Sequence, residues 1–400
     1  MRLDPFHALR RCAALLLLLL AVTPAAAQDG PAVQLGPRPY YLVERMAEGA
    51  LKDRLAQCAA ERTAFAPAAF SIGHRGAPLQ FPEHTKDSYE AAARMGAGVI
   101  ECDVTFTADK ALVCRHAQCD LHRTTNILET PLAARCGRST GRQDVCCASD
   151  ITLAEFRTLE GRMDAKGPTP RWRTDLYATG GRPMTHAESI ALLDRLGVGF
   201  TPELKAPAVT MPFDGLTRED FARRMIAEYK EAGIAPERVR PQSFSLDDIL
   251  FWLRTEPVFG RRAVFLEGRD REIDPADPSD DRLDPNMRQL RALGVRAVAP
   301  PIWILLTTRN GRIVPSRYAE AAKRAGLEIL SWTVERSGRI GAEVLRGDGG
   351  YYYRSIRAAL RNDGDILTVI DVLAREVGIA GLFSDWPATT TFYANCMEIR

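Results

Sequence analysis

The sequence predicts an α/β protein, a (β/α)8 TIM barrel with a disulfide-rich insertion after a hairpin on the second strand. Apolar segments of strand length alternate with amphipathic helical segments along most of the 400 residues. Such alternation is typical of a parallel sheet with helices outside it. Charged side chains follow several of these segments, as expected for a barrel whose functional groups stand at the C-terminal ends of its strands.

The first two predicted strands end at His74 and Asp103, and the other six cover 198–204, 238–244, 262–267, 296–299, 328–334 and 380–384. Helices are predicted between them, for example over 218–232, 285–293 and 316–325. A capping box, Thr185 with Glu188 three residues later, opens another helix. His186 in its first turn is expected to be exposed.

The second strand is followed by a turn of about four residues and a third short apolar segment. A parallel connection needs a dozen or more residues, so this segment must fold back as a hairpin. Centring the hairpin on Ala108 and Asp109 puts His116 roughly opposite Glu101 and Asp103. One histidine is thereby brought to a pair of acids.

Glu101 and Asp103 are two residues apart, so in a strand both side chains share one face. Carboxylates this close repel each other, and the usual remedies are a hard cation or a shared proton. Glu203 stands at the end of a later strand and would bring a third carboxylate. Three carboxylates with water suit Ca²⁺ or Mg²⁺ better than zinc, so these three residues are the predicted ligands of a divalent cation.

Basic side chains are predicted at the same end of the barrel. His74 and Arg75 follow the first strand, and Lys205 follows the strand of Glu203. Arg75 and Lys205 could bind a phosphate, or could form a salt bridge with the carboxylates at the barrel mouth.

Several motifs, in this order, resemble the glycerophosphodiester phosphodiesterase family. They are HRG at 74–76, PEHT at 82–85, ECDVTFTADKALVCRH at 101–116, RTTNI at 123–127, ELK at 203–205, QSF at 242–244, SWTVE at 331–335 and GLFSDWP at 381–387. The resemblance covers about residues 68–392 and implies metal-dependent hydrolysis of a small glycerophosphodiester to glycerol 3-phosphate and an alcohol.

The implied mechanism gives His74 and His116 the roles of general acid and base, with the assignment between them open. A cation on Glu101, Asp103 and Glu203, together with Arg75 and Lys205, would stabilise the charge that develops on the phosphoryl oxygens. The attacking group is either the glycerol 2-hydroxyl, which gives a cyclic intermediate, or water. Supporting roles are expected for Glu83, Gln242, Ser243 and Trp332.

Two positions depart from the family pattern. His84 stands where the family usually has Asn, and Ala117 stands where it commonly has Asp after the histidine. Asp120 or His122 is therefore expected to orient His116. Two other functions stay open: a phosphodiesterase that acts on intact phospholipid or another polyol phosphodiester, and a non-catalytic exported binding protein.

The predicted domains are a signal peptide over 1–27, an N-terminal extension over 28–67, the barrel over 68–392 with its insertion at about 117–183, and a tail over 393–400. The apolar core of the signal is too short for a stable membrane anchor. We expect export to a periplasm or secretion, by the general or the twin-arginine route. A net charge of +2 and 46% hydrophobic residues indicate no nucleic-acid partner, and the oligomeric state is left open.

Eight of the nine cysteines remain after the expected cleavage, and an even number in an exported chain favours disulfides. Five of them lie between 114 and 147, where they would staple the insertion. A metal site is the competing interpretation, but a cluster of deprotonated thiolates would be oxidised in an exported chain. Cys102 is expected to be a buried free thiol or to bond to another strand.

Three further segments could bear on the site. The acidic, proline-rich residues 270–284 are expected to be a solvated excursion, and Glu267 either faces substrate or begins that loop. Tyr351–Tyr353 either wall a substrate pocket or pack on the barrel rim. The insertion is expected to determine which substrates are accepted.

Overall fold

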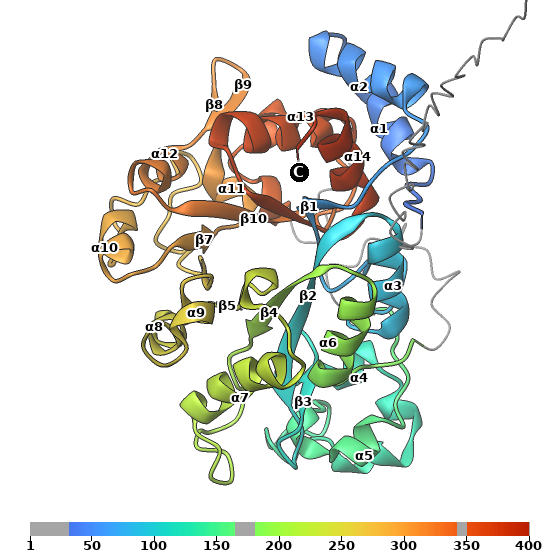
Figure 1. Cartoon of the computed structure of the whole chain (residues 1–400), viewed down its shortest axis with the longest axis vertical. Coiled ribbons are helices and arrows are strands. Elements are labelled where there is room, and N and C mark those ends of the chain that lie inside the picture. Colours follow the sequence, from blue (N-terminus) through green and yellow to red (C-terminus); the bar gives the residue numbers. More distant parts are fainter. Residues whose placement is uncertain (1–31, 165–180, 342–349, 400) are drawn as a thin grey trace, which may run out of the picture. The chain divides into compact units, whose positions relative to one another are not determined.

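Eight parallel strands close into a ring in the computed structural model, which describes residues 32–164, 181–341 and 350–399 (Figure 1). The strands are β1 (Ala68–Gly73), β2 (Ala97–Phe106), β4 (Gly199–Leu204), β5 (Gln242–Ser243), β6 (Val264–Leu266), β7 (Ala297–Ala299), β10 (Glu328–Val334) and β11 (Gly381–Ser384). Each pairs in parallel with the next, and β11 pairs with β1. These are the eight segments expected from the sequence, so the predicted (β/α)8 barrel is confirmed.

Several of the helices that follow the strands begin at a polar capping residue, among them the helix opened by the predicted cap Thr185. The main ones are α3 (Lys86–Arg94), α6 (His186–Arg195), α7 (Arg218–Glu231), α8 (Leu246–Thr255), α10 (Met287–Ala292), α12 (Arg317–Arg324), α13 (Asp365–Asp371) and α14 (Ala388–Cys396). Thr85, Thr185 and Thr217 each accept a backbone N–H of the first turn through the side-chain oxygen. Shorter helices are α4 (Leu121–Thr124), α5 (Leu153–Phe156), α9 (Pro257–Gly260) and α11 (Ile302–Leu305).

The prediction of an exposed His186 is wrong. Its side chain is fully buried, and Nδ1–H donates to Glu228 Oε2 of α7 at 2.8 Å. The ring also meets Tyr229 edge to face at 5.0 Å between centroids. Helix α6 packs on α7 along this side, so a residue in its first turn is covered.

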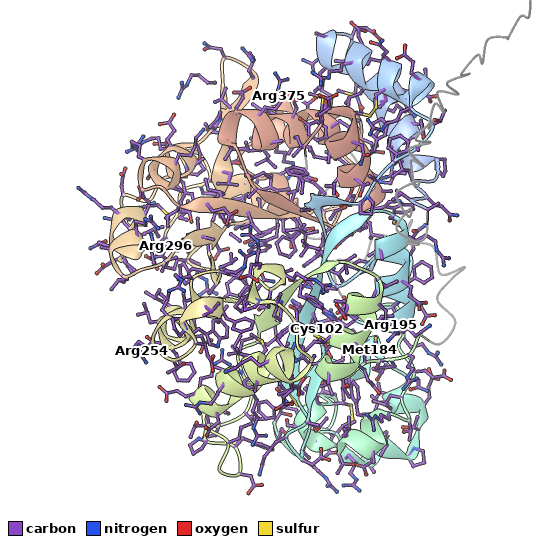
Figure 2. The ribbon with its side chains drawn as sticks, in the orientation of Figure 1. Cys102, Met184, Arg195, Arg254, Arg296 and Arg375 are labelled. Atoms are coloured by element: carbon purple, nitrogen blue, oxygen red, sulfur yellow. A yellow bond between two sulfur atoms is a disulfide. The ribbon has the colours of Figure 1, made fainter. Side chains whose placement is uncertain are left out.

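The hairpin after β2 is confirmed. Strand β3 (Leu112–Cys114) pairs antiparallel with the end of β2, with Thr105 opposite Val113. This register centres the turn on Asp109, half a residue later than predicted. Cys114 forms a disulfide with Cys102, which Figure 2 labels, so Cys102 bonds to a neighbouring strand and is not a free thiol.

The insertion is stapled by two disulfides, Cys119–Cys147 and Cys136–Cys146, as expected from its cysteines. It contains α4 and α5 and has its own small hydrophobic cluster, which includes Leu121, Ile127 and Phe156. The segment 171–180, part of the predicted insertion, lies outside the described residues.

The N-terminal extension forms two helices, α1 (Arg38–Arg45) and α2 (Ala50–Glu61). The disulfide Cys58–Cys396 joins α2 to α14 across 338 positions of sequence. The predicted signal peptide lies outside the described residues. Within the ranges described, no helix combines the length and apolar character needed to cross a membrane.

Two features of the second half of the chain were not expected. Strands β8 (Leu306–Arg309) and β9 (Arg312–Pro315) form a separate hairpin. The loop over 270–284 is only partly solvated, because Ile273 and Leu283 are buried in the core. Its acids Asp277 and Asp281 pair with Arg317 of α12, so the loop is attached to the barrel.

Apolar side chains fill the barrel interior below its functional end. Ile72, Val264, Leu266, Leu330 and Phe383 form one buried cluster contributed by four strands. The charged side chains of the site lie beyond this cluster, at the C-terminal ends of the strands.

Candidate active site

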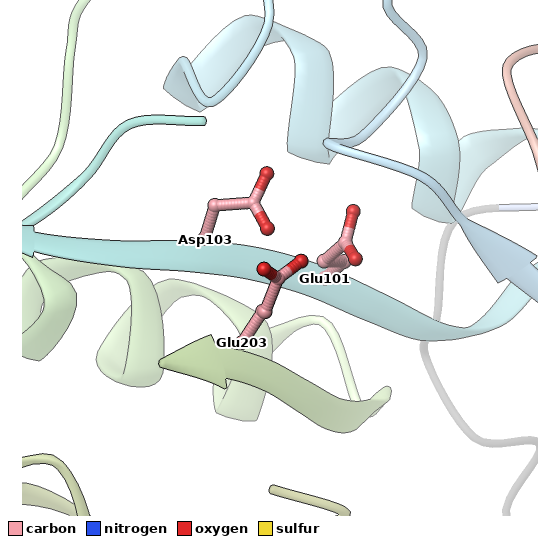
Figure 3. A group of neighbouring side chains, drawn as sticks. All are labelled: Glu101, Asp103 and Glu203. Carbon is pink, nitrogen blue, oxygen red and sulfur yellow. The ribbon is translucent and has the colours of Figure 1, made fainter. Parts of the chain in front are cut away.

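Three carboxylates converge at the C-terminal ends of two neighbouring strands. Glu101 and Asp103 share a face of β2, and Asp103 lies beside Glu203 in the register of β2 with β4. Figure 3 shows the three carboxyl groups turned toward one another. Each offers an oxygen that lies within 4.8 Å of the others, and all three side chains are buried.

The charges of this trio are only partly balanced. Burial, with repulsion from Asp103 and Glu203, raises the pKa of Glu101 well above its usual range. Burial also raises the pKa of Glu203 to about 7, against the opposing effect of Lys205. The pKa of Asp103 is instead well below its usual value, because Lys205 and His84 outweigh the effect of burial.

These donors fit a hard divalent cation. Asp103 Oδ1 is buried and has no hydrogen-bond partner, while Oδ2 accepts a hydrogen bond from His84 Nε2 at 2.8 Å. An acceptor left unpaired beside two further carboxylates is costly without a cation. Buried carboxylate oxygens are the ligands that Ca²⁺ and Mg²⁺ prefer.

His74 follows β1 and is held by a carboxylate. Its Nδ1–H donates to Asp385 Oδ1 at 2.6 Å, and its Nε2 lies 3.8 Å from Glu101 Oε2. Burial lowers the pKa of His74 to about 4, although Asp385 opposes this shift. Asp385 is in turn paired with Arg336, whose Nε lies 2.9 Å from Oδ2. The ring therefore has a defined orientation, with Nε2 on the side of the carboxylate trio.

His116 follows β3 and lines the same cavity as His74. Burial, together with Arg75 and Lys205, lowers its pKa well below the usual value. No hydrogen bond joins its ring to another described residue. Asp120 instead accepts the Ala117 N–H at 3.1 Å, so the expectation that Asp120 orients His116 is not met.

His122 was the other residue expected to orient His116. Its Nδ1 accepts the Cys146 N–H at 3.3 Å within the insertion. The structure gives no hydrogen bond between His122 and His116. Both residues follow the hairpin in sequence, but His122 bonds within the insertion whereas His116 lines the cavity.

Arg75 and Lys205 form salt bridges with carboxylates, which was one of the two roles predicted for them beside phosphate binding. Arg75 Nη1 donates to Glu83 Oε2 at 2.9 Å, and its backbone N–H donates to Glu101 Oε2 at 3.1 Å. Lys205 Nζ lies 2.7 Å from Glu203 Oε1 and 3.9 Å from Asp103 Oδ1. Burial alone would lower the pKa of Lys205, but these two acids raise it, so the side chain carries a positive charge into the cavity.

The expected supporting residues separate into two groups. Glu83 anchors Arg75, Gln242 Nε2 donates to Glu101 Oε1 at 2.9 Å, and Trp332 lines the cavity. Ser243 does not line it, because its hydroxyl donates to Asp248 Oδ2 at 2.6 Å, on the side of α8. Its contact orders the loop after β5.

The cavity between these groups has a volume of about 390 Å³. Besides the predicted residues it is lined by Arg123 and Asp164 of the insertion, which form an ion pair at 2.7 Å. The insertion therefore reaches the site, as expected. Tyr352 also lines the cavity whereas Tyr353 is fully buried, so the tyrosine run both walls the pocket and packs on the rim.

Three residues at the C-terminal end of the barrel make side-chain contacts that were not predicted from the sequence. His84 binds Asp103, Asp385 binds His74, and Arg336 binds Asp385. Asp385 directly follows a strand end, which was the available signal. Glu267 was left between two roles and is buried in an ion pair with Arg269 at 2.7 Å, outside this cavity.

Comparison with known proteins agrees with this geometry. A sequence profile described as the glycerophosphoryl diester phosphodiesterase family matches residues 74–389. An Arthroderma benhamiae protein named "Extracellular protein" is 48% identical over 252 residues, which is 62% of this chain and 96% of the relative. A Bacillus subtilis glycerophosphodiester phosphodiesterase is 46% identical over 186 residues, 45% of this chain and 54% of that protein.

A solved structure shares the fold. It is a Silicibacter pomeroyi protein assigned as a glycerophosphoryl diester phosphodiesterase, with a TM-score of 0.56 and 20% sequence identity. The alignment covers 84% of this chain and 94% of that one. The family match spans most of the chain, and the chain therefore belongs to the glycerophosphoryl diester phosphodiesterase family and is an enzyme of that class.

Proposed function

We propose that this protein hydrolyses glycerophosphodiesters to glycerol 3-phosphate and an alcohol, with a divalent cation and with His74 and His116 as the acid–base pair. The observation that carries the proposal is that both imidazoles, Arg75, Lys205 and two carboxylates of the trio, Glu101 and Glu203, line one 390 Å³ cavity, with Asp103 close to those two carboxylates. Family membership supports the reaction class.

The charges in the cavity match a phosphodiester. The substrate carries one negative charge, and displacement at phosphorus moves more charge onto the phosphoryl oxygens. Arg75 and Lys205 face that position with buried, charge-paired side chains. Glu101, Asp103 and Glu203 would hold the cation, which would supply further stabilisation of this charge when bound.

Two proton transfers remain for the histidines. One takes the proton of the attacking hydroxyl, from water or from the glycerol 2-hydroxyl, as its oxygen bonds to phosphorus. The other gives a proton to the alcohol oxygen as the phosphorus–oxygen bond breaks. On the 2-hydroxyl route the product of this step is a cyclic phosphodiester, and a second pair of proton transfers lets water bond to phosphorus and the 2-oxygen leave with a proton. The Asp385 contact keeps the proton of neutral His74 on Nδ1 and leaves Nε2 available for transfer. Each transfer is expected to contribute about 10²- to 10⁴-fold to the rate.

We also propose that the protein is exported and acts in a periplasm or outside the cell. Four disulfides link all eight cysteines from Cys58 onward, and disulfides in such number are typical of proteins in an oxidising compartment. The Arthroderma benhamiae relative is named as extracellular. We also propose the domain bounds predicted from the sequence, including the signal peptide over 1–27.

The test measures release of glycerol 3-phosphate from glycerophosphocholine by the oxidised protein. Activity should disappear with EDTA and return with Ca²⁺ or Mg²⁺. His74→Ala and His116→Ala should each abolish turnover while the circular dichroism spectrum is unchanged. Turnover that resists EDTA, or near wild-type turnover by either variant, would remove that component from the mechanism. Cleavage of phosphatidylcholine vesicles but of no soluble diester would favour the phospholipid alternative.

A further inference from the structure

A second cavity of about 670 Å³ lies beside the catalytic one and shares Phe244 and Trp332 with it. Phe244 follows β5 and Trp332 lies on β10, so both belong to the functional end of the barrel. Other lining residues are Tyr351 and the acids Asp270 and Asp284. The reaction described so far uses none of these acids.

Aromatic faces form the wall between the two cavities. Phe244 and Trp332 are nearly perpendicular, with ring centroids 5.9 Å apart, and Tyr351 stacks beside Trp332 at 6.3 Å and 27°. Trp332 is fixed by donation from Nε1 to the Ala299 carbonyl at 2.8 Å, so its N–H is not available to a ligand. Phe244 is 42% exposed, so its ring is accessible from the cavity.

The polar lining of the second cavity favours a cation. Among the described residues, the only arginine that lines this cavity is Arg269, which is paired with Glu267 at 2.7 Å. Asp270 accepts the Tyr351 hydroxyl at 3.4 Å and lies 3.6 Å from Arg354. Asp284 is exposed and makes no side-chain ion pair with any described residue. Aromatic faces with an unmatched carboxylate attract a cation that cannot donate hydrogen bonds.

The catalytic cavity is instead lined by positive charge where the phosphate is proposed to bind, because Arg75 and Lys205 lie there. A single substrate with an anionic and a cationic end would fit both. We propose that the second cavity receives the cationic alcohol half of a zwitterionic phosphodiester, preferably a quaternary ammonium, and thereby sets headgroup preference. This inference rests on the proposed function.

The first experiment compares two glycerophosphodiesters of the same shape. One is glycerophosphocholine, and the other carries a neutral tert-butyl group in place of trimethylammonium. We expect kcat/KM to favour the charged ester by about tenfold. Equal kcat/KM values for two esters that are both hydrolysed would overturn the inference and leave the proposed function standing.

Matched variants locate the effect. Asp284→Asn and Tyr351→Leu should each lower the preference for the charged ester several-fold. Asp277→Asn removes the same charge from the same loop away from the cavity, and Tyr351→Phe retains the ring, so both should keep the preference. A preference that is lost equally in Asp277→Asn and Asp284→Asn would show a general charge effect and contradict the assignment.

Binding without turnover separates this inference from the proposed function. Calorimetry should show choline binding tighter than its tert-butyl isostere, with the difference reduced in Asp284→Asn. If neither ester is hydrolysed, the proposed function fails while this measurement still decides the inference. Equal binding of choline and its isostere would overturn it.

Discussion

His84 and Asp103 form a buried hydrogen bond of 2.8 Å, and the other Asp103 oxygen has no hydrogen-bond partner. His84 Nδ1 accepts the Tyr89 hydroxyl at 3.0 Å, which places the ring proton on Nε2. The backbone of His84 has a φ of +56°, in the left-handed region where His and Asn are both enriched among non-glycine residues. The residue that departs from the family pattern therefore touches a predicted metal ligand.

His84→Ala is expected to weaken Ca²⁺ binding by about 10- to 100-fold, because it removes the group that orients Asp103. Isothermal titration calorimetry of the metal-free protein measures this directly. Tyr89→Phe keeps the His84–Asp103 bond and serves as the matched control, with a smaller loss expected. Wild-type affinity in a correctly folded His84→Ala protein would show that this bond does not orient the ligand.

Asp385→Asn is expected to lower kcat by about 100-fold or more, with a smaller effect on KM. The amide cannot hold the Nδ1 proton of His74 as the carboxylate does, so the neutral ring would lose its fixed tautomer. Steady-state kinetics at several pH values would show the change in kcat and a shifted pH profile. A kcat within threefold of wild type would show that Asp385 only packs against the ring.

Glu335→Gln is expected to change the pH dependence of stability. Burial raises the pKa of Glu335 to about 7, while the unfolded chain has the usual value near 4.5. As pH rises through this interval the unfolded state loses its proton first, so wild-type stability falls, with a full cost of roughly 3 kcal/mol above pH 7. The variant lacks this contribution, and its amide oxygen can still accept the Ser384 hydroxyl.

Urea unfolding at pH 5 and pH 8 tests this expectation. The free energy of unfolding of Glu335→Gln, relative to wild type, should increase from the first pH to the second. Parallel profiles for the two proteins would mean that Glu335 ionises in the folded state near its usual pKa.

Removal of the Cys102–Cys114 disulfide and removal of the Cys58–Cys396 disulfide should have different effects on activity and stability. Cys102 lies between Glu101 and Asp103, and Cys114 is two residues before His116, so Cys102→Ala/Cys114→Ala is expected to lower kcat roughly tenfold or more through misplaced groups. Cys58→Ser/Cys396→Ser should instead lower the free energy of unfolding by about 2–5 kcal/mol and leave kcat unchanged. Equal kcat values for the two double variants would show that the hairpin disulfide does not affect catalysis.

Local patterns in the sequence were sufficient to predict most of the fold. Apolar segments of strand length, caps such as Thr185 and the short turn before β3 depend on residues close together in the sequence, so they could be predicted. The convergence of Glu101, Asp103 and Glu203 also followed, because strand ends meet at one end of a barrel. The β8–β9 hairpin was missed because it lies within what was expected to be a helical connection.

The sequence by itself determined the barrel, the carboxylate trio and the two histidines that face one cavity. Only the tertiary structure decided what each side chain touches: that Asp385 holds His74, that His84 holds Asp103, that His186 is buried and which cysteines bond. These contacts join residues far apart in the chain, for example 311 positions between His74 and Asp385. Their partners depend on the packing of helices and loops, which side-chain periodicity does not encode.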